Sequence, residues 1–186
     1  MHFDVDSFVS QCRAANRSGA DPINAVRDVV DEAVSRAAEI LQVLPASGEE
    51  EILLYQSSDL TIYRVLVFQG LQYPPHEHGM PVVLGIYAGC ETNLLYTRLK
   101  EDHHRIKQIG RIDVGAPQVR VLDGDVIHSV TNPHPEPAAA LHVYFGNLSL
   151  QKRSLWTLDL DGEQQFDPQS YFARARQLEL ATYRYK

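Results

Sequence analysis

The stretch His128–Tyr144, which reads HSVTNPHPEPAAALHVY, combines the features that decide how this chain folds and what it can bind. It begins with a histidine four residues before Asn132 and ends in a short apolar run that carries His142 and Tyr144. Prolines lie between these two parts and indicate a loop. A second stretch, Pro74–Gly79 (PPHEHG), adds two histidines, so the chain offers three imidazoles for one site.

The residues around these stretches predict a mainly β fold. Residues 51–145 contain short runs of β-branched and aromatic residues, separated by Gly, Asp and Pro at fairly regular intervals. Many short strands with turns between them are typical of a sandwich or barrel, not of a parallel sheet with alternating helices. We expect strands over residues 52–57, 60–68, 81–88, 91–100, 105–114, 119–122 and 140–145.

Helices are expected before and after the strands. Apolar residues recur at helical spacing over residues 8–19 and again over 22–45, where Asp21 and Pro22 supply an N-cap and a first helical position. A strand containing Trp156 and a last helix are expected near the C-terminus. We predict one domain, with a helical N-terminal cover over residues 1–45, a β-barrel over 50–160 and a C-terminal extension over 161–186.

Composition argues against several classes of function. The net charge of −7 disfavours a nucleic-acid surface, and no run approaches the roughly 20 apolar residues of a membrane span. Two cysteines provide no disulfide framework, and the N-terminus lacks the basic and then apolar pattern of a secretion signal. We therefore expect a cytoplasmic monomer or homodimer with no nucleic-acid or membrane partner.

His76, His78 and His128 are the candidate metal ligands. Alternate residues of a strand point to the same face, so His76 and His78 can reach one ion while Glu77 points away. His128 follows a Gly-Asp pair and precedes Asn132. Imidazole suits iron, zinc, copper and nickel, so the type of ligand leaves the metal open.

The order of these motifs resembles the cupins, whose small antiparallel barrel carries His-x-His in a first motif and a lone His in a second. The Glu that usually follows the first pair is absent, and residues 79–83 read GMPVV there. His-x-Val-x-Asn from His128, the later Glu-Pro-Ala from Glu136 and Leu-His-Val-Tyr ending at Tyr144 resemble more specifically the cysteine dioxygenase family of thiol dioxygenases, in its bacterial branch. This resemblance covers residues 54–145, and the expected N-terminal helices are also similar to those of that branch.

The resemblance implies a double-stranded β-helix in which the three histidines hold Fe(II), although zinc or nickel remains possible in the isolated protein. It implies an enzyme that adds both atoms of O2 to the sulfur of a small thiol and gives a sulfinate. Tyr144 would contact the substrate or oxygen, and His142 would hold Tyr144 in place. Ala140, His142 and Tyr144 share one face of a strand, which is compatible with these roles.

Two departures from the family pattern bear on substrate and mechanism. Ala140 replaces the serine that precedes the His–Tyr pair, so another group must orient His142. Where cysteine-specific members carry an Arg for the substrate carboxylate, an ungapped comparison places Glu51, which is therefore a candidate substrate-binding residue that would repel a carboxylate. Arg64 is a possible substitute, but we expect it to be exposed. A thiol without a nearby carboxylate, or one bearing an amine, fits better than free cysteine.

Two other functions stay open. Another metal-dependent cupin oxygenase or isomerase acting on a small organic molecule would use the same histidines. A non-catalytic cupin that binds a metal or small ligand would use them as well. The Tyr–His pair favours an enzyme, because a protein that only binds metal needs no oriented phenol beside it.

Overall fold

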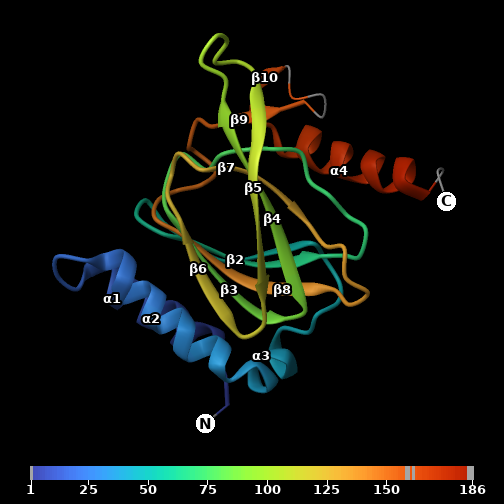
Figure 1. The fold of residues 1–186 in the computed structure, drawn as a ribbon. Helices are drawn as coiled ribbons and strands as arrows, with labels where there is room; N and C mark the ends of the chain where they lie inside the picture. The colour runs from blue at the N-terminus through green and yellow to red at the C-terminus, as the bar shows by residue number, and fades with distance from the viewer. Residues whose placement is uncertain (1, 158–159, 161, 184–186) are drawn as a thin grey trace.

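Two antiparallel sheets form the centre of the molecule, and helices cover one of them (Figure 1). The computed structural model describes residues 2–157, 160 and 162–183, with side chains up to Ala175. Residues 158–159 of the expected barrel, and 161 and 184–186 of the expected C-terminal extension, lie outside this part. The first sheet has the order β1 (Glu51–Gln56), β2 (Thr61–Val67), β8 (Ala138–Tyr144), β3 (Val82–Ala88) and β6 (Gln118–Leu122). The second has the order β5 (Ile106–Gly115), β4 (Cys90–Arg98) and β7 (Ile127–Thr131).

A short extended segment, residues 74–78, completes the second sheet. His76 pairs with His128 of β7 through two backbone hydrogen bonds of 2.9 Å, and it also bridges to Leu155 in β9 (Ser154–Trp156). With this segment beside β7, the facing sheets read β2-β8-β3-β6 and 74–78-β7-β4-β5. These are the strand orders of a jelly roll built from two Greek keys. The expected mainly β, double-stranded β-helix is confirmed.

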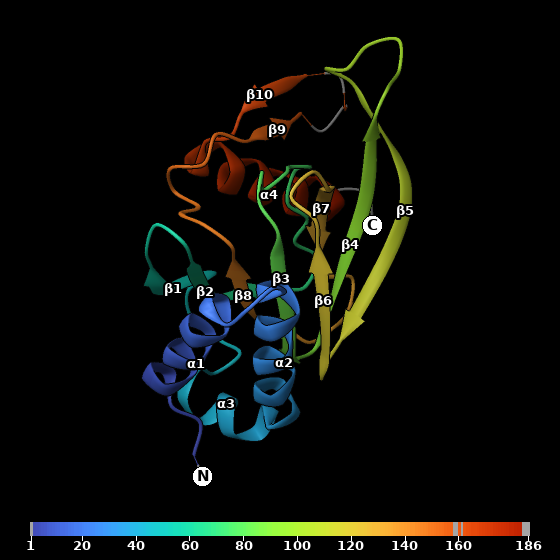
Figure 2. The same ribbon diagram turned by 90° about the vertical axis from the view of Figure 1, so that its left-hand side faces the viewer.

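Helices α1 (Val5–Arg17), α2 (Pro22–Ser35) and α3 (Ala37–Val43) lie against the outer face of the first sheet (Figure 2). Asp21 accepts a hydrogen bond from the backbone of Asn24, and Pro22 occupies the first turn, as the sequence predicts. The single helix expected over residues 22–45 is wrong, because the chain leaves helical geometry at Arg36 (φ −106°, ψ 40°). Apolar spacing continues across this break, which is why the sequence reads as one helix.

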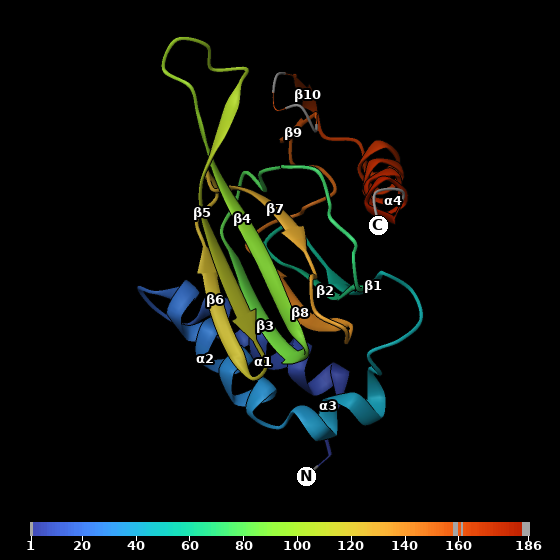
Figure 3. The same cartoon turned by 45° about the vertical axis from the view of Figure 1, so that its right-hand side comes forward.

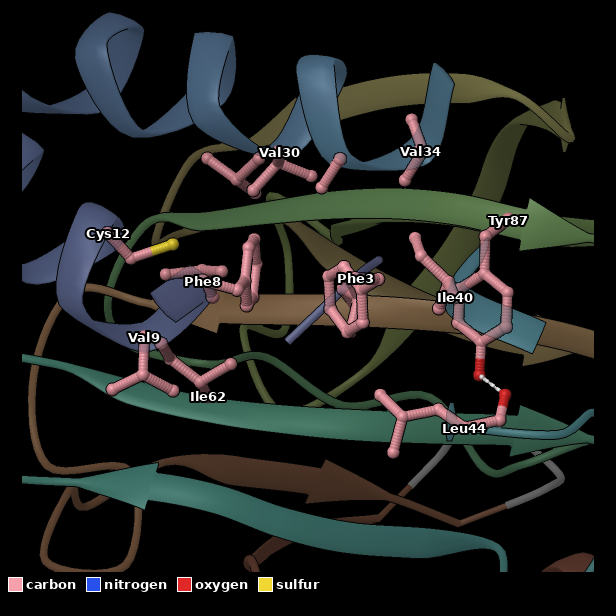
Figure 4. Packing of buried hydrophobic residues seen from close by; sticks show 14 of the residues in the cluster. Phe3, Phe8, Val9, Cys12, Val30, Val34, Ile40, Leu44, Ile62 and Tyr87 are labelled. Atoms are coloured by element: carbon pink, nitrogen blue, oxygen red, sulfur yellow. Dashed lines mark hydrogen bonds between the residues drawn. The ribbon is translucent and has the colours of Figure 1, made fainter. Parts of the chain in front are cut away.

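The main hydrophobic core lies between these helices and the sheet. Val30 and Val34 of α2 point at the sheet, and the Tyr87 hydroxyl of β3 donates a hydrogen bond to the Leu44 carbonyl at 3.0 Å (Figure 4). Gly85 of β3 permits this close approach, because a Cβ there would lie 2.3 Å from Cγ1 of Val30. The opposite face of the same sheet is turned toward the interior of the barrel, where the candidate site lies.

The C-terminal part lies at the end of the barrel that is away from α1–α3 (Figure 3). β9 pairs with β10 (Glu163–Gln165), and α4 (Pro168–Tyr183) lies away from α1–α3 (Figure 3). Within the described residues, no helix is both long and apolar enough to cross a membrane. The strand around Trp156 and the last helix agree with the sequence, whereas β7 and β10 were not predicted.

Candidate metal centre

The structure brings the three predicted ligands together. Nε2 of His78 lies 3.1 Å from Nε2 of His76 and 3.1 Å from Nε2 of His128. All three side chains are buried, and their ligand atoms form a group that could hold a metal ion. Metal–imidazole bonds of about 2.0–2.1 Å place neighbouring nitrogens about 2.9–3.4 Å apart in octahedral or tetrahedral geometry. The observed separations fall in this range.

His76 and His78 were expected on a regular strand, but they lie in the irregular segment 74–78. Pairing of this segment with β7 on one side and β9 on the other still keeps it extended, so alternate residues face the same side. Glu77 points to the other side and binds Arg98, with distances of 3.2 and 3.3 Å between their charged atoms.

Hydrogen bonds at Nδ1 leave Nε2 of two histidines as acceptors. Nδ1 of His76 donates to the Pro74 carbonyl at 3.1 Å, and Nδ1 of His128 donates to Oδ1 of Asn93 at 2.6 Å. His78 can donate its Nε2 hydrogen to only one of these neighbours. The Nε2 lone pair of the other neighbour therefore receives no hydrogen from these three rings. A cation between the three rings would bind this lone pair, so the residues fit a metal.

Burial keeps the three imidazoles neutral. It lowers the pKa of His76 and His78 well below the ordinary value, and nearby His128 adds to the effect. Burial also lowers the pKa of His128 to about 4, against the opposing charge of Glu91. Neutral imidazole is the form that binds metals, so the site is ready for a cation at neutral pH.

Tyr144 and His142 of β8 lie beside this centre. The Tyr144 hydroxyl is 3.1 Å from Nδ1 of His142, and the Tyr144 ring centre is 5.0 Å from that of His78. Burial raises the pKa of Tyr144, so the phenol keeps its proton. On the other side of His142, Nε2 lies 3.6 Å from a carboxylate oxygen of Glu91 in β4. Sequence reasoning required an orienting group for His142 but did not find this residue.

A cavity of about 180 Å³ contains the three histidines, His142 and Tyr144 in its wall. Tyr171 of α4 also lines it, stacking on Tyr73 with ring centres 4.9 Å apart and meeting the His76 ring edge-on at 4.9 Å. The volume of the cavity suits a molecule of a few non-hydrogen atoms. Apolar side chains make up much of the remaining wall, namely Val65, Val67, Val130, Leu148, Phe166 and Phe172.

The charged residues of this cavity differ in part from the expectation. Glu51 lines the cavity from the start of β1, where the residue is also exposed to solvent. Arg64 is not exposed, so that expectation is wrong. It is 1% exposed, faces the helices and donates to the Glu49 carbonyl at 2.6 Å. Arg153, which the sequence did not suggest, lines the cavity, and its guanidinium lies 3.4 Å from the Phe166 ring centre.

Comparisons with known proteins concern the fold. No family model and no curated protein sequence matches the chain. A double-stranded β-helix protein from Klebsiella pneumoniae is 15% identical over 59% of this chain and 86% of its own, with a TM-score of 0.42. An RmlC-like cupin family protein from Methanocaldococcus jannaschii is 14% identical over 55% of this chain and 86% of its own, with a TM-score of 0.44.

One similar structure is an enzyme of stated activity. Hydroquinone 1,2-dioxygenase from Sphingomonas, with 4-hydroxybenzoate bound, is 11% identical over 58% of this chain and 72% of its own, with a TM-score of 0.45. An identity of 11% and a TM-score of 0.45 do not assign the activity of that enzyme to this chain. The chain is thus a double-stranded β-helix protein with a buried three-histidine group that could bind a metal.

Proposed function

We propose that this chain is a mononuclear non-haem Fe(II) dioxygenase that adds both atoms of O2 to the sulfur of a small thiol and releases a sulfinate. One observation carries the proposal. Three histidines with convergent ligand atoms and Tyr144 line the same small, largely apolar cavity. An oriented phenol beside a metal site serves a reaction better than it serves storage or sensing of the metal.

The donor set fits Fe(II). His76, His78 and His128 would hold it, and three neutral imidazoles leave its +2 charge uncompensated, which favours an anionic ligand such as a thiolate. When bound, iron would supply the binding of thiol and O2 and the electron transfer between them. Zinc and nickel suit the same ligands, so the activity must be compared between protein loaded with iron and protein loaded with these metals.

The chain's own residues would position the reactants. Tyr144 would contact the substrate sulfur or oxygen, and His142 would hold Tyr144 through the 3.1 Å contact. The apolar wall and Tyr171 would limit the entry of water. The reactants are thus a small thiol and O2, and the absence of nucleic-acid and membrane partners remains part of the proposal.

Two charges bear on which thiol is used. Glu51 would favour an amine-bearing thiol over a carboxylate-bearing one, which makes free cysteine a poor candidate. Arg153 lines the same cavity and would act in the opposite direction. We therefore propose that the balance between Glu51 and Arg153 sets the preference among small thiols.

Oxygen uptake by Fe(II)-loaded protein tests the proposal. The thiols would be cysteine, cysteamine, 3-mercaptopropionate and a peptide beginning with cysteine, with each product analysed for sulfinate. Glu51→Gln is expected to lower the ratio of kcat/KM for cysteamine to that for 3-mercaptopropionate by about 10-fold, equivalent to about 1.4 kcal/mol. An unchanged ratio would remove Glu51 from substrate binding.

A further inference from the structure

A buried carboxylate lies behind the Tyr144–His142 pair. Glu91 of β4 is 1% exposed, and one of its carboxylate oxygens is 3.6 Å from Nε2 of His142. The other oxygen accepts a hydrogen bond from the Asn93 side-chain amide at 2.9 Å. A carboxylate is costly to bury without partners, so its location calls for an explanation in terms of the groups around it.

Glu91 is ionised in this environment. Burial alone would raise its pKa, but the contact with His142 and the Asn93 amide bring the pKa of Glu91 below its ordinary value. The negative charge therefore remains next to the imidazole of His142. An anionic carboxylate accepts hydrogen bonds and donates none, so it favours a hydrogen on the nitrogen that faces it.

His142 has one nitrogen free to respond. Its Nδ1 faces the Tyr144 hydroxyl, whereas its buried Nε2 makes no hydrogen bond within the described part of the chain. A shift of about half an ångström would turn the 3.6 Å approach of Glu91 into a hydrogen bond. No other carboxylate forms an ion pair with His142 among the described residues.

We propose that Glu91 is a positioning residue, which holds a hydrogen on Nε2 of His142 so that Nδ1 accepts the hydroxyl hydrogen of Tyr144. This role rests on the proposed function, because Tyr144 must act on the substrate for it to matter. Glu91 supplies the orienting group that the sequence lacks at Ala140. The arrangement has the logic of a Ser-His-Asp triad, with a phenol in place of the serine hydroxyl.

The arrangement provides an acceptor for the hydrogen of the substrate thiol. With its own hydrogen directed at His142, the Tyr144 oxygen presents a lone pair to the cavity and can accept the hydrogen of an entering S–H group. The S–H bond breaks as the phenol hydrogen passes to Nδ1 of His142. The substrate becomes a thiolate, Tyr144 remains a phenol, and the resulting imidazolium is balanced by the Glu91 carboxylate.

Glu91→Gln tests this role, because the amide can keep the hydrogen bond from Asn93 while its NH2 group faces Nε2 of His142. The hydrogen of His142 should then move to Nδ1, and Tyr144 should become the acceptor. Nitrogen-15 spectra of zinc-loaded protein at about pH 9, where imidazole is ordinarily neutral, would show which nitrogen carries the hydrogen. Signals of His142 are identified by their loss in His142→Gln.

Kinetics provide the second readout. Glu91→Gln should lower thiol turnover about 10²-fold or more, with metal content and Tm unchanged. Because Glu91 acts through Tyr144, the double variant with Tyr144→Phe should lose no more than Tyr144→Phe alone. Asp113→Asn is the matched control, since it makes the same change on neighbouring β5 away from His142, and it should leave turnover unchanged.

A hydrogen on Nδ1 of His142 in the wild-type protein would overturn the inference, and this measurement does not require Glu91→Gln to fold. Additive losses in the double variant would overturn it as well. If the wild-type protein carries the hydrogen on Nε2 but oxidises no thiol, the proposed function fails, whereas the placement of the His142 hydrogen by Glu91 stands.

Discussion

At the scale of single residues, Asn93 shows how the site is prepared for a metal. Its amide nitrogen donates to Glu91 at 2.9 Å, which fixes its oxygen toward His128, and that oxygen accepts from Nδ1 at 2.6 Å. The Nε2 atom of His128 therefore carries no hydrogen, and its lone pair can bind a cation. One buried carboxylate is thus linked to a candidate metal ligand, through Asn93, and lies 3.6 Å from His142 of the Tyr144–His142 pair.

Tyr144→Phe separates metal binding from chemistry. The variant should retain iron, because no ligand is altered, but lose about 10²-fold or more of its turnover, because the hydroxyl is absent. Iron content and oxygen uptake would be measured on the same sample. His128→Ala is the complementary variant, which should lose the metal itself. Unchanged turnover in the first variant removes Tyr144 from the mechanism, and unchanged iron content in the second contradicts the three-histidine site.

At the scale of elements, α2 and β3 show how closely the helical cover fits the barrel. Gly85 lies under α2, where a Cβ would be 2.3 Å from Cγ1 of Val30 and 2.9 Å from Cγ1 of Val34. Both valines are buried in the core, so neither can turn into solvent. The absence of a side chain at Gly85 therefore sets the distance between the helix and the sheet.

Gly85→Ala should accordingly reduce the free energy of unfolding by about 1–3 kcal/mol, the usual cost of overpacking a core. Urea denaturation would measure it. Gly110→Ala is the control within β5, where the nearest atom to an added Cβ is Cδ1 of Leu95 at 3.9 Å. It should have little effect or a small stabilising one. Equal stability of Gly85→Ala and wild type would show that α2 can move away from β3 without cost.

Local sequence signals account for much of the fold. Short runs of β-branched and aromatic residues between turn residues predicted most strands, and the Asp21–Pro22 cap predicted the start of α2. The strand β7 was missed because its five residues include the polar side chains of His128 and Ser129, which serve the site and interrupt an apolar pattern. The break at Arg36 was missed because apolar spacing continues on both sides of it.

The site could be predicted only where a motif lies on one stretch of chain. The structure brings together the three histidines, His142 and Tyr144, which belong to such motifs. Glu51, which came from the ungapped comparison, lines the same cavity. Glu91 and Arg153 join them through strand pairing and through the loop before β9, and sequence gives neither the register of the strands nor the path of that loop. A signal for Glu91 did exist, since Glu91 and Asn93 are alternate polar residues of a strand and share one face.

At the scale of the whole molecule, the site exists only when the barrel is closed. His76 and His78 come from the segment between β2 and β3, His128 from β7, Tyr144 from β8 and Tyr171 from α4. Metal binding to residues so far apart in the chain should be coupled to folding. Bound metal is thus expected to raise the Tm.

The metal-free protein should lose stability as the pH falls from about 6.5 to about 4. The pKa of buried His128 is about 4 in the folded protein, against about 6.5 in an unfolded chain. Between these values the unfolded state binds more protons, so the free energy of unfolding falls with pH, by up to about 3 kcal/mol for this residue. The lowered pKa values of His76 and His78 act in the same direction.

Urea denaturation of chelator-treated protein across this pH range would measure the loss. His128→Gln, which lacks the ionisable ring, should show a shallower dependence than the wild type. Identical pH dependence in the two proteins would contradict the view that His128 is buried as a neutral imidazole.

Oxidation of a thiol is the activity that we propose for the three-histidine centre and Tyr144. The most direct test is oxygen uptake by Fe(II)-loaded protein with the panel of small thiols, with the sulfinate product quantified against the oxygen consumed. We expect uptake with at least one thiol, one sulfinate formed for each O2, and loss of this activity in His128→Ala. Iron-loaded protein that consumes no oxygen with any of these thiols would show that the chain is not a thiol dioxygenase for these substrates.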